Sequence, residues 1–119
     1  MLRTISFLTL ILFFSGNLSA QEIPAKENNY RLIISFVSAG SGIDGKTQQK
    51  VMAFITMHSS KPAYETFKWG REGEVDYCMH LKELSSSKQK VFVKNVKKLI
   101  KGKELVLLLE NQDYVKKGK

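Results

Sequence analysis

The chain has 119 residues, carries 19 Lys and Arg against 11 Asp and Glu, and contains one cysteine. This length allows one domain with a single hydrophobic core, and one cysteine excludes an internal disulfide. The basic charge favours anionic partners such as lipid headgroups, polysaccharides or acidic proteins, and a lysine-rich surface that only keeps the protein soluble is the alternative.

The first twenty residues have the layout of a secretory signal peptide. Arg3 gives a basic start, an apolar run over residues 5–14 follows, and the small residue Ala20 ends the segment. We expect cleavage after Ala20, periplasmic or secreted localisation in a bacterium, a flexible leader over residues 21–29 and no transmembrane span in the mature form. An uncleaved N-terminal anchor is the alternative. Arg3 is the only charged residue of this segment, so the mature chain keeps a net charge of about +7.

The next elements alternate between strand and helix patterns. Residues 30–38 are rich in β-branched and aromatic side chains and apolar on both faces, which is typical of a central strand. Residues 46–60 predict a helix with Asp44 as its N-cap, and residues 63–70 predict a second strand. The helix has an expected buried stripe made of Val51, Met52, Phe54, Ile55 and Met57.

A tight turn and a third strand follow. In the turn over residues 71–73, Gly73 can take positive φ. Residues 74–81 alternate in polarity: Val75, Tyr77, Met79 and Leu81 share one face, and Glu74, Asp76, Cys78 and His80 share the other. These two strands therefore predict an antiparallel hairpin.

The last third of the chain predicts a helix, a strand and a tail. Ser86 and Gln89 fit a capping box at the start of the helix, and Gly102 fits its C-terminal stop. The helix has an expected buried stripe of Phe92, Val96, Leu99 and Ile100. The apolar run over residues 104–110 predicts a final buried strand, and residues 111–119 form a basic tail.

The order strand, helix, strand, strand, helix, strand predicts an α+β fold. With the two middle strands paired as a hairpin, the compact solution is the ferredoxin-like βαββαβ sandwich, a four-stranded antiparallel sheet with two helices on one face. We assign residues 30–110 to this domain.

A glycine-rich loop joins the first strand to the first helix. Gly40, Gly45, Lys46 and Thr47 match the phosphate-binding loop pattern, in which the lysine reaches the outer phosphates and the hydroxyl holds Mg²⁺. The nucleotide-binding folds need parallel strands joined by helices, and a short chain with a hairpin cannot build that sheet. We therefore keep nucleotide or phosphate binding by this loop as the alternative function only.

Two loops and one helix face are candidate binding surfaces. The glycine loop contributes Gly40, Ser41, Gly42 and Asp44, and the hairpin tip contributes Trp69, Arg71, Glu72 and Glu74. Trp and Arg are frequent at binding hot spots, and the alternative is that Trp69 anchors the hairpin to the core. The two loops make one site if they lie at the same end of the sheet.

The second helix carries a lysine flank made of Lys90, Lys94, Lys97, Lys98 and Lys101. It is a candidate contact for anionic polymers or membranes, and a solvated helix face is the alternative. Modules of this fold class bind RNA through sheet aromatics. Phe36 and Tyr77 are available, but the signature is missing, so we expect no specific nucleic acid partner.

Cys78 and His80, with Asp76 as a third donor, could ligate zinc or copper. Neighbours at i and i+2 of a strand point in parallel, whereas a closed site needs four converging ligands, so we expect no metal. Cys78 is then either buried and inert or paired between molecules. We find no catalytic constellation and expect neither a cofactor nor an enzyme.

The segments GSGID (residues 40–44) and GREGEVDYC (residues 70–78) resemble those of small uncharacterised exported bacterial proteins, mostly from Bacteroidota. The likeness runs from about Tyr30 to Glu110 and implies a bacterial, single-domain protein without carrying over any catalytic residue. Taken together, we expect a small exported, non-enzymatic binding or interaction module for an anionic or protein partner, as a monomer or weak dimer.

Overall fold

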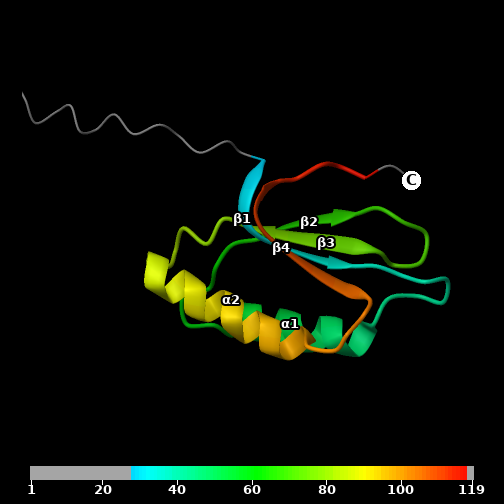
Figure 1. The fold of residues 1–119 in the computed structure, drawn as a ribbon, viewed down its shortest axis with the longest axis horizontal. Coiled ribbons are helices and arrows are strands. Elements are labelled where there is room, and N and C mark those ends of the chain that lie inside the picture. The colour runs from blue at the N-terminus through cyan, green and yellow to red at the C-terminus, as the bar shows by residue number, and fades with distance from the viewer. Residues whose placement is uncertain (1–27, 118–119) are drawn as a thin grey trace, which may run out of the picture.

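The computed structural model describes residues 28–117, which form one four-stranded antiparallel sheet with two helices packed on one face (Figure 1). In chain order the elements are β1 (Asn29–Phe36), α1 (Gly45–Thr56), β2 (Glu65–Lys68), β3 (Val75–Met79), α2 (Ser86–Ile100) and β4 (Val106–Asp113). The strand order is β2-β3-β1-β4. Each helix therefore connects two strands that are separated by a third, and the predicted ferredoxin-like α+β topology is confirmed.

The predicted signal peptide, residues 1–20, lies outside the described residues, and so does all of the predicted leader except Asn28 and Asn29. Asn29 already belongs to β1, where its side-chain amide donates to Asp113 over 2.8 Å. Within the described part of the chain, neither helix has the length and apolarity that crossing a membrane requires.

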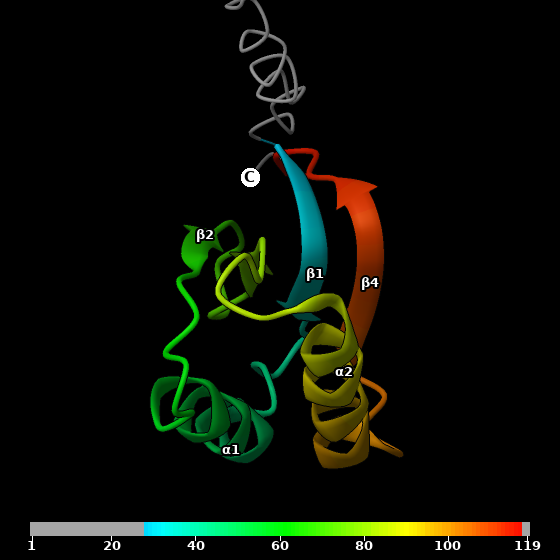
Figure 2. The same cartoon turned by 90° about the vertical axis from the view of Figure 1, so that its left-hand side faces the viewer.

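β1 lies in the middle of the sheet, as its apolar sequence predicts, and pairs with β3 on one side and β4 on the other. Leu32, Ile34 and Phe36 are fully buried between the sheet and the helices. Figure 2 shows α1 and α2 side by side under the same face of the sheet. The main core joins residues from every layer: Leu32, Ile34, Phe36, Val51, Ile55, Val75, Tyr77, Met79, Phe92, Val93, Val96 and Val106.

The helix ends follow local hydrogen-bonding chemistry. Asp44 caps α1 as predicted. The predicted capping box at Ser86 is shifted by one residue, because Ser85 has the extended backbone of an N-cap and accepts from the Lys88 amide. Gln89 instead donates its side-chain amide to the carbonyls of the preceding loop. Gly102 takes φ +78° after α2 and ends the helix as predicted.

Two elements are shorter than the sequence pattern predicts. α1 ends at Thr56 instead of residue 60, and Met57 is 80% exposed instead of buried. The Thr56 hydroxyl donates to the Met52 carbonyl in the last turn, and the helix ends about one turn before the predicted residue 60. β2 covers only Glu65–Lys68, because it extends no further than its single partner, β3.

The prediction that residues 104–110 form a buried strand is wrong in one respect. β4 is an edge strand, and Leu107 and Leu109 are 48% and 37% exposed. Their side chains lie on the sheet face opposite the helices, beside Ser35 and Ile33 of β1. A continuous apolar run is typical of a strand covered on both faces, and here only one face is covered by helices.

The residues after β4 fold back over the open face of the sheet. Figure 1 shows the chain turning at the end of β4 and running along the side away from the helices. The Tyr114 amide donates to the Asn28 carbonyl over 2.7 Å, and the Tyr114 ring stacks on Phe67 of β2 at 4.5 Å between centroids. We call residues 114–117 the C-terminal strap.

Candidate functional site

The glycine loop and the hairpin tip lie at the same end of the sheet. The Ser38 hydroxyl at the start of the glycine loop donates to the Glu72 carboxylate over 2.7 Å. Gly73 has a φ of +95° and lies close to Ile43: a Cβ added at Gly73 would be 3.8 Å from the Ile43 side chain. A cavity of about 340 Å³ lies between them, lined by Ile43, Gln48, Lys68, Gly70, Gly73, Glu74, Val75 and Tyr77. The structure thus brings the two predicted loops together.

The acidic residues of the hairpin tip hold the tip itself. Glu74 folds its carboxylate over Gly70, where a Cβ would lie only 2.0 Å from the nearest carboxylate oxygen. The same carboxylate accepts the Glu72 amide over 2.8 Å. Arg71 is exposed, and no hydrogen bond or ion pair is found for its side chain within the described residues. The tip therefore offers a cation, and its two acids serve the loop backbone and Ser38.

The glycine loop uses its own hydrogen-bond donors. Ser38 Oγ accepts the amides of Gly40 and Gly42, each over 2.9 Å. Asp44 accepts the Thr47 amide over 3.1 Å and the Thr47 hydroxyl over 2.7 Å, and these bonds lower the pKa of Asp44. Thr47 is 2% exposed. Hydrogen bonds within the loop therefore engage the Thr47 hydroxyl, which would hold Mg²⁺, and the amides of Gly40, Gly42 and Thr47.

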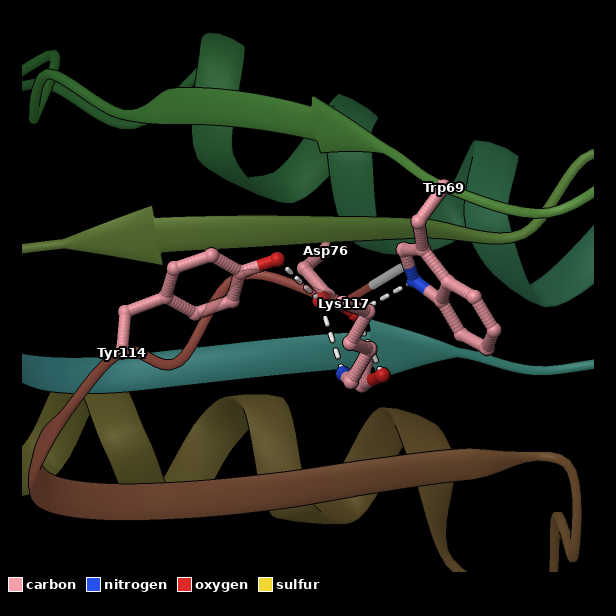
Figure 3. Close-up of polar contacts among 5 residues, drawn as sticks. Trp69, Asp76, Tyr114 and Lys117 are labelled. Carbon is pink, nitrogen blue, oxygen red and sulfur yellow. Dashed lines mark hydrogen bonds and ion pairs between the residues drawn. The ribbon is translucent and has the colours of Figure 1, made fainter. Parts of the chain in front are cut away.

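The side chain of Trp69 points from the hairpin tip toward the open sheet face (Figure 3). This position agrees with the alternative that Trp69 anchors the hairpin. Its indole N–H donates to Asp76 Oδ1 over 3.1 Å, and Ser35 Oγ donates to the same oxygen. The strap completes the cluster: Tyr114 OH and Lys117 Nζ donate to Asp76 Oδ2 over 2.7 and 2.8 Å (Figure 3). Asp76 is fully buried and has four donors.

The Asp76 cluster keeps its carboxylate ionised. Burial by itself raises the pKa of Asp76, but the bonds from Lys117, Ser35 and Tyr114 outweigh it and hold the pKa below its ordinary value. Burial and the bond to Asp76 raise the pKa of Tyr114. The Lys117 ammonium also lies 5.0 Å from the Trp69 ring centroid, at cation–π distance. The charge of Lys117 is thus neutralised on the open face and adds nothing to the lysine flank.

We expect Lys117→Met to destabilise the fold by about 1 kcal/mol at pH 7, less than a fully buried pair because solvent screens a side chain that is 38% exposed. Lys116→Met, a change of the same charge at an exposed neighbour, is the control and should leave urea unfolding unchanged. Folding lowers the pKa of Asp76 below its unfolded value near 3.8. The destabilisation caused by Lys117→Met is therefore full above that unfolded pKa, and it disappears as the pH falls through the pKa of the folded protein. Equal effects of the two variants at pH 7 would show that the ion pair stabilises nothing.

Cys78 and His80 do not form a metal site with their neighbours. Residues 28–117 contain no grouping of three or more His, Cys, Asp or Glu side chains that converge on one point. Cys78 is 1% exposed, and burial, followed by the nearby charge of Asp76, raises its pKa to about 12. The His80 ring stacks on Tyr30 at 4.5 Å. Cys78 is therefore a buried, protonated thiol, as the first of the two alternatives predicted from the sequence has it.

The lysine flank is exposed along α2 and borders a groove at the end of β4. Lys90, Lys94 and Lys97 line this groove of about 220 Å³ together with Arg31 and Glu110. Lys97 and Arg31 each lie 3.0 Å from a Glu110 oxygen, and their hydrogen bonds lower the pKa of Glu110. We call these five side chains the basic groove. Four of its charged groups are cations and one is an anion, so it is positive overall.

The two aromatic side chains considered for base stacking do not lie on the open sheet face. Phe36 and Tyr77 point to the helices and are 0% and 8% exposed. On the open face, Phe67 is already stacked on Tyr114. The aromatic side chains considered for RNA binding are therefore in the core.

Sequence reasoning missed Arg31, Ser35, Tyr114 and Lys117 as partners in these clusters. One signal was present: Tyr114 is the aromatic residue of a mostly polar tail. A large aromatic ring at this position favours packing of the tail against the domain, because such rings are usually buried.

These features define a class of protein: a small ferredoxin-like α+β domain with its own C-terminal strap over the sheet, two joined loops at one end and a basic groove beside β4. No protein-family model matches the chain, and no curated protein or solved structure is significantly similar to it.

Proposed function

We propose that this protein is an exported, non-enzymatic interaction domain that binds an anionic partner through the lysine flank and the basic groove. The observation that supports it most is the groove itself, where Arg31 joins three lysines of α2 around a single carboxylate. Since Lys97 and Arg31 share Glu110, Lys90 and Lys94 keep their charge uncompensated within residues 28–117. A concave surface of one sign concentrates ligands of the opposite sign.

The occupation of the other surfaces also supports this choice. On the open sheet face, the strap donates two hydrogen bonds to Asp76. In the glycine loop, the amides of Gly40 and Gly42 bond to Ser38, and the Thr47 hydroxyl bonds to Asp44. Binding through any of these groups would require breaking existing hydrogen bonds, whereas the basic groove presents ammonium groups that are already exposed.

Export and origin belong to the same proposal. The signal-peptide layout of residues 1–20 and the resemblance to exported Bacteroidota proteins both favour a protein outside the cytoplasm. Anionic polysaccharides, lipid headgroups and acidic proteins are the ligands of that environment, whereas nucleoside triphosphates are scarce there.

The test is an NMR titration of ¹⁵N-labelled protein, residues 21–119, with a heparin oligosaccharide, a glutamate-rich peptide, anionic lipid vesicles and Mg-ATP in parallel. We expect at least one of the first three to shift or broaden the amides of Lys90, Lys94 and Lys97, and the glycine loop to stay unchanged with Mg-ATP. Shifts confined to residues 40–47 with Mg-ATP, and none on α2 with any ligand, would overturn the proposal in favour of the phosphate-binding alternative.

A further inference from the structure

β4 has a free edge. Within residues 28–117 it pairs with β1 in seven register positions and with no other strand. Figure 2 shows it at the outer margin of the sheet, next to α2. Alternate residues of an edge strand direct their N–H and C=O groups outward, where another extended segment can pair with them.

The usual protection of such an edge is missing over residues 106–109. The segment Val-Leu-Leu-Leu-Glu contains no lysine, proline or glycine, the residues that natural proteins place on edges to prevent pairing. The first irregular position is Asn111, whose φ of +53° interrupts the regular strand. The four apolar residues 106–109 therefore carry none of these protections, and Glu110, the charged residue of the segment, is paired with Lys97 and Arg31.

The two sides of this edge differ in chemistry. On the open face, Leu107 and Leu109 are exposed, and Val115 of the strap, which is 76% exposed, lines a hollow together with Leu109. On the helix face, Glu110 leads into the basic groove and its lysines. An added strand would place alternate side chains on these two sides, because successive residues of a strand point to opposite faces.

We infer that β4 takes up an extended segment of an acidic partner protein as a fifth strand. The segment alternates, with apolar residues over Leu107 and Leu109 and acidic residues toward the basic groove. Main-chain hydrogen bonds to β4 supply affinity, and the two kinds of side chain supply register and specificity. This inference rests on the proposed function and names its partner as a protein strand.

Charge argues against a second copy of this chain as the occupant. Two copies paired edge to edge through β4 would be related by a two-fold axis. That axis would bring two lysine flanks to the same side of the joined sheet, and each mature chain is basic overall. The repulsion is avoided when the added strand is acidic.

The experiment compares three synthetic peptides of about eight residues: an alternating Glu–Leu sequence, and the same sequence with N-methyl groups on one or on the other set of alternate residues. N-methylation removes the backbone donors and leaves the charges and side chains in place. We expect the first peptide to bind, to slow amide hydrogen exchange over residues 106–110, and to lose at least tenfold in affinity when its outward N–H groups are methylated. Both N-methylation registers are made, because only one of them faces β4.

The outcomes separate the inference from the proposed function. Equal binding of all three peptides, with shifts on α2, would overturn the strand inference and keep the anionic-partner proposal. Binding of heparin or vesicles but of no peptide would overturn it as well. Leu107→Glu should also abolish peptide binding, whereas Met57→Glu, at another exposed apolar residue outside β4 and α2, should not. A shift of the free protein to dimers that depends on Leu107 would identify a second copy and contradict the inference.

Discussion

Replacing Asp76 with alanine is expected to lower the free energy of unfolding by about 3 kcal/mol, because it leaves one buried indole N–H, one buried hydroxyl and the strap without their shared acceptor. Asp76 is fully buried and accepts from Ser35, Trp69, Tyr114 and Lys117. Three of these donors come from other elements of the fold, so the carboxylate joins β1, the hairpin and the strap at one point.

The measurement is urea unfolding at pH 7, with amide exchange of Tyr114 as a local readout. The Tyr114 amide bonds to the Asn28 carbonyl, and its exchange should accelerate when the strap detaches. Glu104→Ala, an exposed acid with the same change of charge, should alter stability by less than about 0.5 kcal/mol. A small effect for Asp76→Ala, with the strap still protected, would mean that the cluster does not hold the strap.

Reversing the charge of Lys90, Lys94 and Lys97 to glutamate is expected to weaken binding of an acidic peptide by about 100-fold, with each reversal costing on the order of 1 kcal/mol. These lysines line the basic groove, and reversal surrounds Glu110 with like charges. Affinity is measured by fluorescence titration of a labelled glutamate-rich peptide at 0.15 M salt (~8 Å screening length), where nonspecific attraction is screened.

The matched control reverses Lys50, Lys61 and Lys82, which are exposed and lie outside α2. Both triple variants have the same net charge, so only the position of the change differs. We expect the control to retain affinity within about threefold. If both variants lose affinity equally, the peptide responds to the net charge of the protein, and the basic groove has no special role.

The fold could be predicted because its determinants are local in sequence. The alternation of residues 74–81, the apolar centre of residues 30–38 and the caps at Asp44 and Gly102 each specify an element within a few residues. Six elements in this order, with the middle strands in a hairpin, leave few compact topologies. The joining of the glycine loop and the hairpin tip follows from that topology.

The remaining features depend on contacts between distant residues. The apolar run over residues 106–110 has the pattern of a buried strand, and only its place in the sheet order makes it an exposed edge. Asp76 and Lys117 are 41 residues apart, and no spacing rule connects them. The glycine loop is a similar case, because the bond from the Gly40 amide to Ser38 becomes evident only in the folded loop.

A charge-swap titration tests the central claim, that the basic groove contacts an anionic partner directly. The protein and the Lys90→Glu, Lys94→Glu, Lys97→Glu variant are each titrated with an alternating Glu–Leu peptide and with an alternating Lys–Leu peptide of the same length. We predict that the unchanged protein binds only the acidic peptide, and that the variant loses it and gains the basic one. Retained binding of the acidic peptide by the variant would contradict the account.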